Sequence, residues 1–371
     1  MKMNIVPELD GLFRQNDTYD YQDYEYPEDF EQSASEAVLI PLLYSAELVI
    51  GLLGNGLLLA VLAQRRRSWR MSDTFILHLS VADILLLLTL PFWAAQAAQQ
   101  GGWCFGVVFC KICVAVFNIN FYCGIFLLVC ISVDCYLSIV HASRLYSHDN
   151  PRLAHISCLS VWIVSLILTL PWCIFLVETK ETTQERTLCD RSYSEPVTHG
   201  KLAARLLHHT LGFLLPAGAL IIVCSCILLR LQRSSKGVQK QKAIMVILPL
   251  VVVFLLCWVP YNFALIVDTF RSRSKEPGDV SSGNHEHSME RALMVTSGLG
   301  FLHACLRPLL YLSLCGNFRN RTLAMLKRAT VESEGSLWEL GVGEATVPDQ
   351  KHAGEEMKQM IAVDQVPSPQ C

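Results

Sequence analysis

The stretch FCKICVAVFNINFYCGIFLLVCISV, residues Phe109–Val133, contains a single charged side chain, Lys111. An α-helix rises about 1.5 Å per residue, so roughly 20 apolar residues cross a hydrocarbon core about 30 Å thick. An open strand in lipid would leave its backbone groups without hydrogen bonds, whereas a helix satisfies them internally. The stretch is therefore predicted to be a transmembrane helix.

Six further apolar blocks flank this stretch, and the seven together cover about half of the 371 residues. The blocks are Ala37–Ala63, Phe75–Ala98, Phe109–Val133, His155–Leu176, Leu202–Leu229, Ala243–Val267 and Ala292–Leu314. Charged residues make up 17% of the chain, against roughly 25% in an average soluble protein. A soluble enzyme is therefore excluded. We predict an all-α bundle of seven transmembrane helices in a lipid bilayer, with no cofactor, no metal site and no nucleic-acid partner.

Basic residues alternate between the two sides of the predicted spans. They follow span one, flank the second inner loop, line the third inner loop and follow span seven. These residues are Arg65, Arg66, Arg67, Arg70, Arg144, Arg152, Arg230, Arg233, Lys236, Lys240, Lys242, Arg319, Arg321, Lys327 and Arg328. Because basic clusters prefer the cytoplasmic side, the N-terminus is predicted to lie outside and the C-terminus inside. Residues 1–36 contain no apolar signal sequence, so we expect span one to insert as its own signal anchor.

The predicted extracellular tail, residues 1–36, holds ten acidic and two basic residues. Four tyrosines are interleaved with the acids, namely Tyr19, Tyr21, Tyr24 and Tyr26. One interpretation is a solvated, disordered tail, which is what most acidic runs are. The interpretation that we favour is an electrostatic attractor for a basic ligand, which sulfation of the tyrosines would strengthen. Asn16 begins an Asn-Asp-Thr sequon and is a predicted glycosylation site.

Two cysteines lie where the oxidising extracellular compartment would reach them. Cys110 is at the outer start of span three, and Cys189 is in the long second outer loop. We predict a disulfide between them, which ties the loop to the top of the helix. Cys104 lies close to Cys110 in the sequence, so it either competes for Cys189 or stays a free thiol.

Several short motifs occur in register with the spans across about 280 residues. They are Gly54-Asn55, Leu79-Ser80-Val81-Ala82-Asp83, Trp162, Pro216, Cys257-Trp258-Val259-Pro260 and Pro308-Leu309-Leu310-Tyr311, followed by Phe318-Arg319. In these motifs the chain resembles the rhodopsin-like G-protein-coupled receptors. The resemblance implies a receptor domain over residues 37–314 and a short amphipathic cytoplasmic helix over 315–329. The polar residues 330–371 are expected to be a disordered cytoplasmic tail.

Finer features are similar to those of chemokine receptors, and in particular to the CXC chemokine receptor type 3 group. They are Thr89-Leu90-Pro91 followed by Trp93, the stretch 117–122, the stretch 297–300, the stretch 136–142 and the run 51–56. This resemblance implies a plasma-membrane protein of immune chemotaxis whose partners are CXC chemokines, heterotrimeric G proteins and arrestin.

The resemblance also implies a ligand pocket at the outer end of the bundle. Its expected residues are Tyr44, Trp93, Phe117, Tyr261, Asp268 and Ser297. Asp268, at the outer end of span six, is the expected charged contact for a basic residue of the ligand. Trp258 and Tyr261 are expected to form the floor and to couple the pocket to movement of span six. Where the type 3 group often has further acids, this chain has Gln96 and Trp172, which leaves the identity of the ligand open.

Three positions depart from the activation machinery of that family. The Asp-Arg-Tyr motif at the inner end of span three is here Asp134-Cys135-Tyr136. A span-five tyrosine that would meet Tyr311 is here Cys224. The Asn-Pro-x-x-Tyr motif begins here with Arg307. Cysteine offers neither the charge nor the five donors of an arginine.

Arg307 is predicted to point towards Asp83 of span two. In the resembling receptors these two positions flank a sodium-binding cavity. An arginine without a partner at this depth costs several kcal/mol, so we predict a buried ion pair that puts a fixed positive charge into this cavity. The alternative is that Arg307 turns to a water-filled interior.

We compare three candidate functions. The first is a chemokine receptor with weakened G-protein coupling that acts as a scavenger, internalised by arrestin or by constitutive cycling through endosomes. The second is a conventional chemotactic receptor that signals through inhibitory G proteins and calcium. The third, remote alternative is a transporter, for which we find no inverted repeats. A light-sensing pigment is excluded, because span seven has no lysine for a Schiff base.

Overall fold

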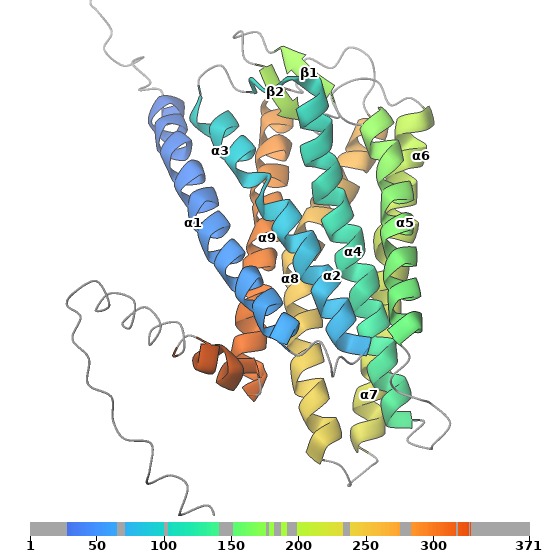
Figure 1. Cartoon of the computed structure of the whole chain (residues 1–371). Helices are drawn as coiled ribbons and strands as arrows, with labels where there is room; N and C mark the ends of the chain where they lie inside the picture. The colour runs from blue at the N-terminus through green and yellow to red at the C-terminus, as the bar shows by residue number, and fades with distance from the viewer. Residues whose placement is uncertain are drawn as a thin grey trace, which may run out of the picture. The chain divides into compact units, whose positions relative to one another are not determined.

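A computed structural model describes most of the membrane domain (Figure 1). It describes residues 28–64, 71–99, 103–140, 151–175, 178–181, 187–190, 199–232, 238–274, 283–316, 318–325 and 327. The chain forms two compact units, Met1–Arg319 and Asn320–Cys371, and the helices discussed below belong to the first.

The first unit consists of long helices with one short hairpin. Its elements are α1 (Glu28–Gln64), α2 (Met71–Leu87), α3 (Leu90–Ala98), α4 (Gly106–Val140), α5 (Pro151–Phe175), β1 (Glu178–Glu181), β2 (Thr187–Asp190), α6 (His199–Leu207), a π-helix (His208–Leu214), α7 (Leu215–Gln232), α8 (Val238–Ser274) and α9 (Gly283–Leu314). Spans two and five each consist of more than one element, α2 with α3 and α6 with the π-helix and α7.

Within the part of the chain that the structure describes, seven helical segments are long and apolar enough to cross a membrane. They are Val38–Gln64, Met71–Ala98, Gly106–Ser138, Arg152–Ile174, His199–Arg230, Met245–Arg271 and Arg291–Leu314. The predicted seven-helix, all-α fold is thus confirmed. Most of the segments extend a few residues beyond the predicted blocks. The blocks contain only the apolar stretches, whereas a helix also includes the polar residues at its two ends.

Span two is interrupted between Leu87 and Leu90, just before Pro91. The Thr89 backbone N–H donates to the Leu86 carbonyl at 3.0 Å, and the Thr89 hydroxyl donates to the same carbonyl at 2.7 Å. Pro91 has no N–H and cannot continue the hydrogen-bond pattern of α2. The chain therefore starts a new helix, α3, which redirects Trp93 and Gln96.

α4 is the central helix of the bundle. It contacts α2, α5, α7 and α8, and its span is the most buried of the seven. α1 lies at the edge, against α2, α3 and α9. Asn55 links α1 to α9, since its side-chain amide donates to the carbonyl oxygens of Gly51 at 2.9 Å and Ala304 at 3.0 Å. Hydrogen bonds of this kind, together with close packing, hold helices together in lipid.

The hairpin of β1 and β2 covers one end of the bundle, near the top of α4 in Figure 1. The strands pair antiparallel, from Glu178 opposite Asp190 to Glu181 opposite Thr187. Neither strand carries an apolar alternation, so no strand is expected there from the sequence. Cys189 of β2 is disulfide-bonded to Cys110 of α4, with Cα atoms 5.5 Å apart. The predicted disulfide is confirmed, and Cys104 is an exposed free thiol.

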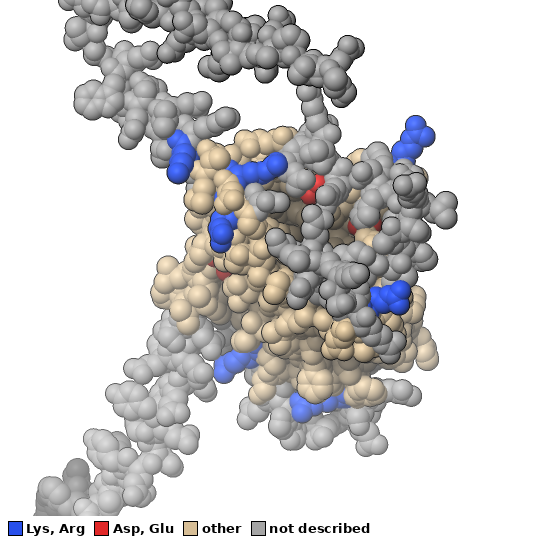
Figure 2. All heavy atoms as spheres, turned by 90° about the horizontal axis from the view of Figure 1, so that it is seen from below, with Lys and Arg blue, Asp and Glu red and all other residues tan. Residues whose placement is uncertain are grey.

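The opposite end of the bundle is the predicted cytoplasmic face. Figure 2 views the molecule from this end and shows lysine and arginine at several places, with acidic side chains at few. This distribution agrees with the expected orientation. Beyond the bundle, residues 318–325 form a helix.

Candidate functional site

Aromatic side chains from four spans meet below the outer end of the bundle. Phe117 of α4 makes edge contacts with Trp258, Tyr261 and Phe301, at ring-centroid distances of 5.2, 5.4 and 5.5 Å. Tyr44 of α1 packs on Phe301 at 5.6 Å. Three predicted pocket residues and the predicted floor residue Trp258 therefore belong to one cluster. Phe301, which sequence reasoning missed, connects Tyr44 to Phe117.

Two further predicted pocket residues, Trp93 and Ser297, make other contacts than the rings around Phe117. Trp93 packs against Trp103 at 5.7 Å, in a cluster that contains the disulfide, and it also reaches the main core. The Ser297 hydroxyl donates to the Met294 carbonyl of its own helix at 2.7 Å. Trp93 therefore connects the aromatic core to the disulfide region.

Gln96 fixes the hairpin to span two. Its side-chain carbonyl oxygen accepts a hydrogen bond from the backbone N–H of Cys189 at 3.0 Å. The disulfide holds the same residue to α4. β2 is therefore held at one residue by two helices.

Asp268, the predicted charged contact for a ligand, forms an ion pair within the protein. Its Oδ2 lies 3.3 Å from Nη2 of Arg205 on α6. The Arg205 side chain is 1% exposed and the Asp268 side chain 12% exposed. The prediction did not include Arg205, because a basic residue so close to the start of a span ordinarily extends to the membrane surface.

Two adjacent histidines of the π-helix extend this polar contact between spans five and six. The Thr269 hydroxyl donates to the Leu265 carbonyl at 2.8 Å, so the 3.1 Å contact between His209 Nε2 and this hydroxyl has the histidine as donor. His208 Nε2 donates to Asn262 Oδ1 at 3.0 Å. Both rings therefore carry a hydrogen on Nε2.

His208 also connects span five to span three. With its hydrogen on Nε2, Nδ1 accepts from the Tyr122 hydroxyl at 2.7 Å. Gly212 allows this approach, because a side chain there would collide with the Tyr122 ring. The wider turn of a π-helix lets two consecutive residues face the bundle interior, and such turns occur often at functional sites.

The core of the bundle contains a second buried ion pair. Arg307 Nη1 lies 2.7 Å from Asp83 Oδ2, with side-chain exposures of 2% and 0%. The Asn120 amide donates to the other Asp83 oxygen at 2.9 Å, and Arg307 Nη2 lies 3.5 Å from the His303 ring. The position predicted for Arg307 is the one observed, next to Asp83, and the guanidinium occupies the space between spans two and seven.

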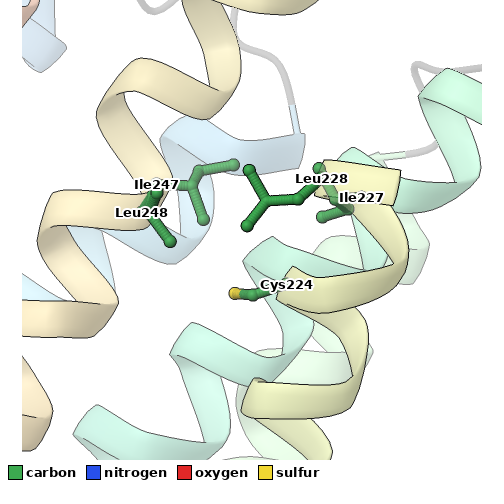
Figure 3. A pocket seen from close by; sticks show the side chains of 5 residues that line it. All are labelled: Cys224, Ile227, Leu228, Ile247 and Leu248. Atoms are coloured by element: carbon green, nitrogen blue, oxygen red, sulfur yellow. The ribbon is translucent and has the colours of Figure 1, made fainter. Parts of the chain in front are cut away.

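The inner end of the bundle is apolar where the family motif has an arginine. Cys135 is 8% exposed and packs in a cluster with Ile227, Tyr136, Ile247 and other aliphatic side chains. A small cavity between α7 and α8 is lined by Cys224, Ile227, Leu228, Ile247 and Leu248 (Figure 3). Asp134, the residue before Cys135 on α4, and Tyr311 of α9 are also buried, at 7% and 4% exposure.

Some predicted site residues lie outside the described residues, namely Asn16, Tyr19, Tyr21, Tyr24 and Tyr26. Among the residues that the structure describes, no three histidine, cysteine or acidic side chains are grouped to hold a metal ion.

Comparisons with known proteins give concordant matches. The model of the seven-transmembrane receptor (rhodopsin family) matches residues 54–311. The chain is 41% identical to the human C-X-C chemokine receptor type 3 over 302 residues, which is 81% of this chain and 79% of that protein. The identity to the bovine (Bos taurus) receptor of the same type is 40% over 323 residues, 85% and 86% of the two chains. The C-X-C chemokine receptor type 1 of Oryctolagus cuniculus is 37% identical over 288 residues, 78% and 79% of the two chains.

Proposed function

Because the chain belongs to the rhodopsin family of seven-transmembrane receptors, and within it to the CXC chemokine receptors, we propose that it captures CXC chemokines at the cell surface with weakened G-protein coupling. It is a multi-pass plasma-membrane receptor and not an enzyme. In the proposed role it removes chemokines from solution, as a scavenger does, instead of driving migration.

The outer half of the molecule supports ligand capture. Ten acids against two bases give residues 1–36 a strongly negative charge, and the four tyrosines lie among them. Such a segment attracts a basic protein over a Debye length of about 8–10 Å. Beneath the outer end lie the aromatic cluster around Phe117 and the carboxylate of Asp268, which is paired with Arg205; a ligand segment that enters the bundle would meet apolar side chains and this ion pair.

The inner half supports weakened coupling, and the observation that carries the proposal is Cys135. It stands where the family has an arginine, and it lies among aliphatic side chains with 8% exposure. A thiol cannot replace an arginine's charge or its hydrogen-bond donors. Cys224, in place of a tyrosine, likewise removes a hydroxyl that would meet Tyr311.

The buried pair of Arg307 and Asp83 acts in the same direction. It joins α9 to α2 with a 2.7 Å contact that no water reaches freely, given exposures of 2% and 0%. Separating two such charges leaves each of them buried without its partner, which is strongly unfavourable. The ion pair therefore opposes a movement of span seven against span two. The asparagine that the family motif has at position 307 carries no charge and would permit this movement.

A conventional chemotactic receptor that signals through inhibitory G proteins is the second candidate. The basic inner face in Figure 2 favours it, since such a face attracts an acidic transducer. Tyr136 of the motif is also retained. Under this candidate, Cys135 is tolerated and has little effect on signalling.

Internalisation is proposed to occur by constitutive cycling through endosomes. The inner tail offers few phosphorylation sites for arrestin recruitment, namely Thr322, Thr330, Ser333, Ser336, Thr346 and Ser368. Arrestin recruitment as strong as that of a serine-rich receptor would contradict this part of the proposal.

The experiment that tests the proposal pairs two readouts in the same transfected cells. Uptake of labelled CXC chemokines and chemokine-driven G-protein activation are measured side by side, with untransfected cells as the background. We expect saturable uptake without activation. Robust activation at chemokine concentrations that saturate uptake would contradict it.

A further inference from the structure

Spans five and six are joined by three buried polar contacts, which we call the polar seam. Its pairs are Arg205 with Asp268, His209 with Thr269 and His208 with Asn262, at 3.3, 3.1 and 3.0 Å. All six residues are between 0% and 9% exposed. Around the seam the two helices present mainly apolar side chains, so these contacts determine how the outer halves of the two spans align.

The ion pair at the outer end of the seam is the part nearest to a ligand. The histidines make hydrogen bonds to uncharged partners, whereas Arg205 and Asp268 carry opposite charges. The Asp268 side chain is 12% exposed and that of Arg205 only 1%. The carboxylate is therefore the more accessible of the two charged groups.

This arrangement sets a condition on any ligand that uses Asp268. The carboxylate already has a guanidinium at 3.3 Å, so a ligand must offer a cation that replaces it. A neutral hydrogen-bond donor does not compensate the charge of a buried carboxylate. An arginine offers a planar fork that matches a carboxylate, and a lysine offers only a point charge.

We propose that Arg205 is the specificity-determining residue of the outer pocket. It occupies Asp268 in the resting receptor, and a basic ligand residue binds this carboxylate only by displacing the guanidinium. Displacement opens the outermost contact of the polar seam and releases the outer end of span five from span six. The ligand part of this proposal rests on the proposed function, chemokine capture, and the seam itself does not.

The seam is tested first without ligand, on purified full-length receptor in lipid nanodiscs. Thermal unfolding is compared for Arg205→Gln, Asp268→Asn and the double variant. We expect each single variant to lower Tm and the double variant to lose less than the sum of the two, because neither charge is then left alone. Arg271→Gln on α8 is the matched control, since it removes an equal charge from an exposed residue. If the decreases in Tm of the two single variants add up in the double variant, Arg205 and Asp268 do not interact and the proposal is wrong.

The second test measures binding of the labelled CXC chemokine that gives the highest saturable uptake in the cell assay. Arg205→Gln leaves Asp268 open to the ligand, so we expect affinity to rise by roughly tenfold, a change within the range for a close charge pair. The gain should disappear in the double variant, and Arg205→Lys, which keeps the charge, should bind nearly as the wild type does. Arg271→Gln should leave affinity unchanged.

The outcomes separate the two proposals. If Arg205→Gln folds and binds chemokine no more tightly than the wild type, displacement of Arg205 is wrong while chemokine capture stands. If no CXC chemokine binds any variant although the unfolding cycle is non-additive, chemokine capture is wrong, and with it the role of Arg205 in ligand specificity.

Discussion

Two buried arginine–aspartate pairs, one in each half of the bundle, differ in what can reach them. Arg307 and Asp83 lie 2.7 Å apart in the core, with exposures of 2% and 0%. Arg205 and Asp268 lie 3.3 Å apart near the outer end, and the aspartate side chain is 12% exposed. The core pair is closed on all sides, whereas the outer pair presents one partner towards the ligand side.

This difference indicates that similar chemistry serves opposite purposes in the two halves. A buried ion pair costs desolvation and returns it only while both partners stay in place. At the outer end a competing cation can take over one partner, so the contact can respond to a ligand. In the core no ligand enters, so the contact fixes spans two and seven. Under the proposals made above, the outer pair responds to a ligand and the core pair does not.

The core pair offers the largest predicted effect. Arg307→Met leaves Asp83 buried without its cation, and we expect a loss of about 3–5 kcal/mol of stability, as when one partner of other buried pairs is removed. Adding Asp83→Asn to the same chain should recover a large part of this loss. Thermal unfolding of the purified receptor measures both changes.

Arg230→Met is the control for this prediction, since it removes an equal charge from an exposed residue of α7. A small loss for Arg307→Met, similar to that for Arg230→Met, would mean that the core pair does not hold the two spans together.

The disulfide tests whether the outer half depends on its own anchor. Cys110→Ala removes the disulfide between two cysteines that are 79 residues apart in the sequence. We expect the free energy of unfolding to fall by about 2–4 kcal/mol. The hairpin would then be held to the bundle mainly through Gln96, so chemokine uptake should fall as well. Cys104→Ala removes an exposed free thiol and should change neither Tm nor uptake. Equal effects of the two variants would contradict the assignment.

The packing of α9 against Trp258 is tested at Gly300. A side chain at this position would lie 2.9 Å from the Trp258 ring, so Gly300→Ala should overpack the core by about 1–3 kcal/mol. Gly298→Ala, two residues earlier on α9, meets nothing within 4 Å and should gain up to about 1 kcal/mol from helix propensity. The difference in Tm between the two variants measures the packing term, and equal Tm values would refute it.

The acidic tail is expected to give the smallest effect. Asp20→Asn with Asp23→Asn should slow chemokine association by less than about tenfold at low salt, and the difference should vanish at high salt as the charges are screened. Glu332→Gln with Glu334→Gln, in the inner tail, should leave the rate unchanged. A salt-independent change in the dissociation rate would mean that the tail binds by specific contacts instead of by charge.

The spans and the core pair follow from the sequence because a single physical cost determines each. About 20 apolar residues have no stable place except a bilayer, and the cost of a lone arginine among them directs Arg307 towards Asp83. The compartment favours a disulfide from Cys189 to Cys110 but leaves Cys104 as a competitor, and the structure resolves this choice in favour of Cys110.

The polar seam does not follow from the sequence. Arg205 is only a few residues from the start of its span, where a basic side chain ordinarily extends to the membrane surface. Nothing in the sequence indicates the π-helix that turns His208 and His209 inward together. The hairpin is also unpredicted, since its pairing is imposed by the disulfide and by Gln96, and not by an apolar alternation.

The central proposal, that G-protein coupling is weakened at the inner end of the bundle, is tested most directly at Cys135. G-protein activation and chemokine uptake are measured in the same cells for the wild type, Cys135→Arg and Cys135→Ala. We expect all three to take up chemokine and only Cys135→Arg to activate the G protein on ligand addition. Strong activation by the wild type, with no further gain in Cys135→Arg, would contradict the claim.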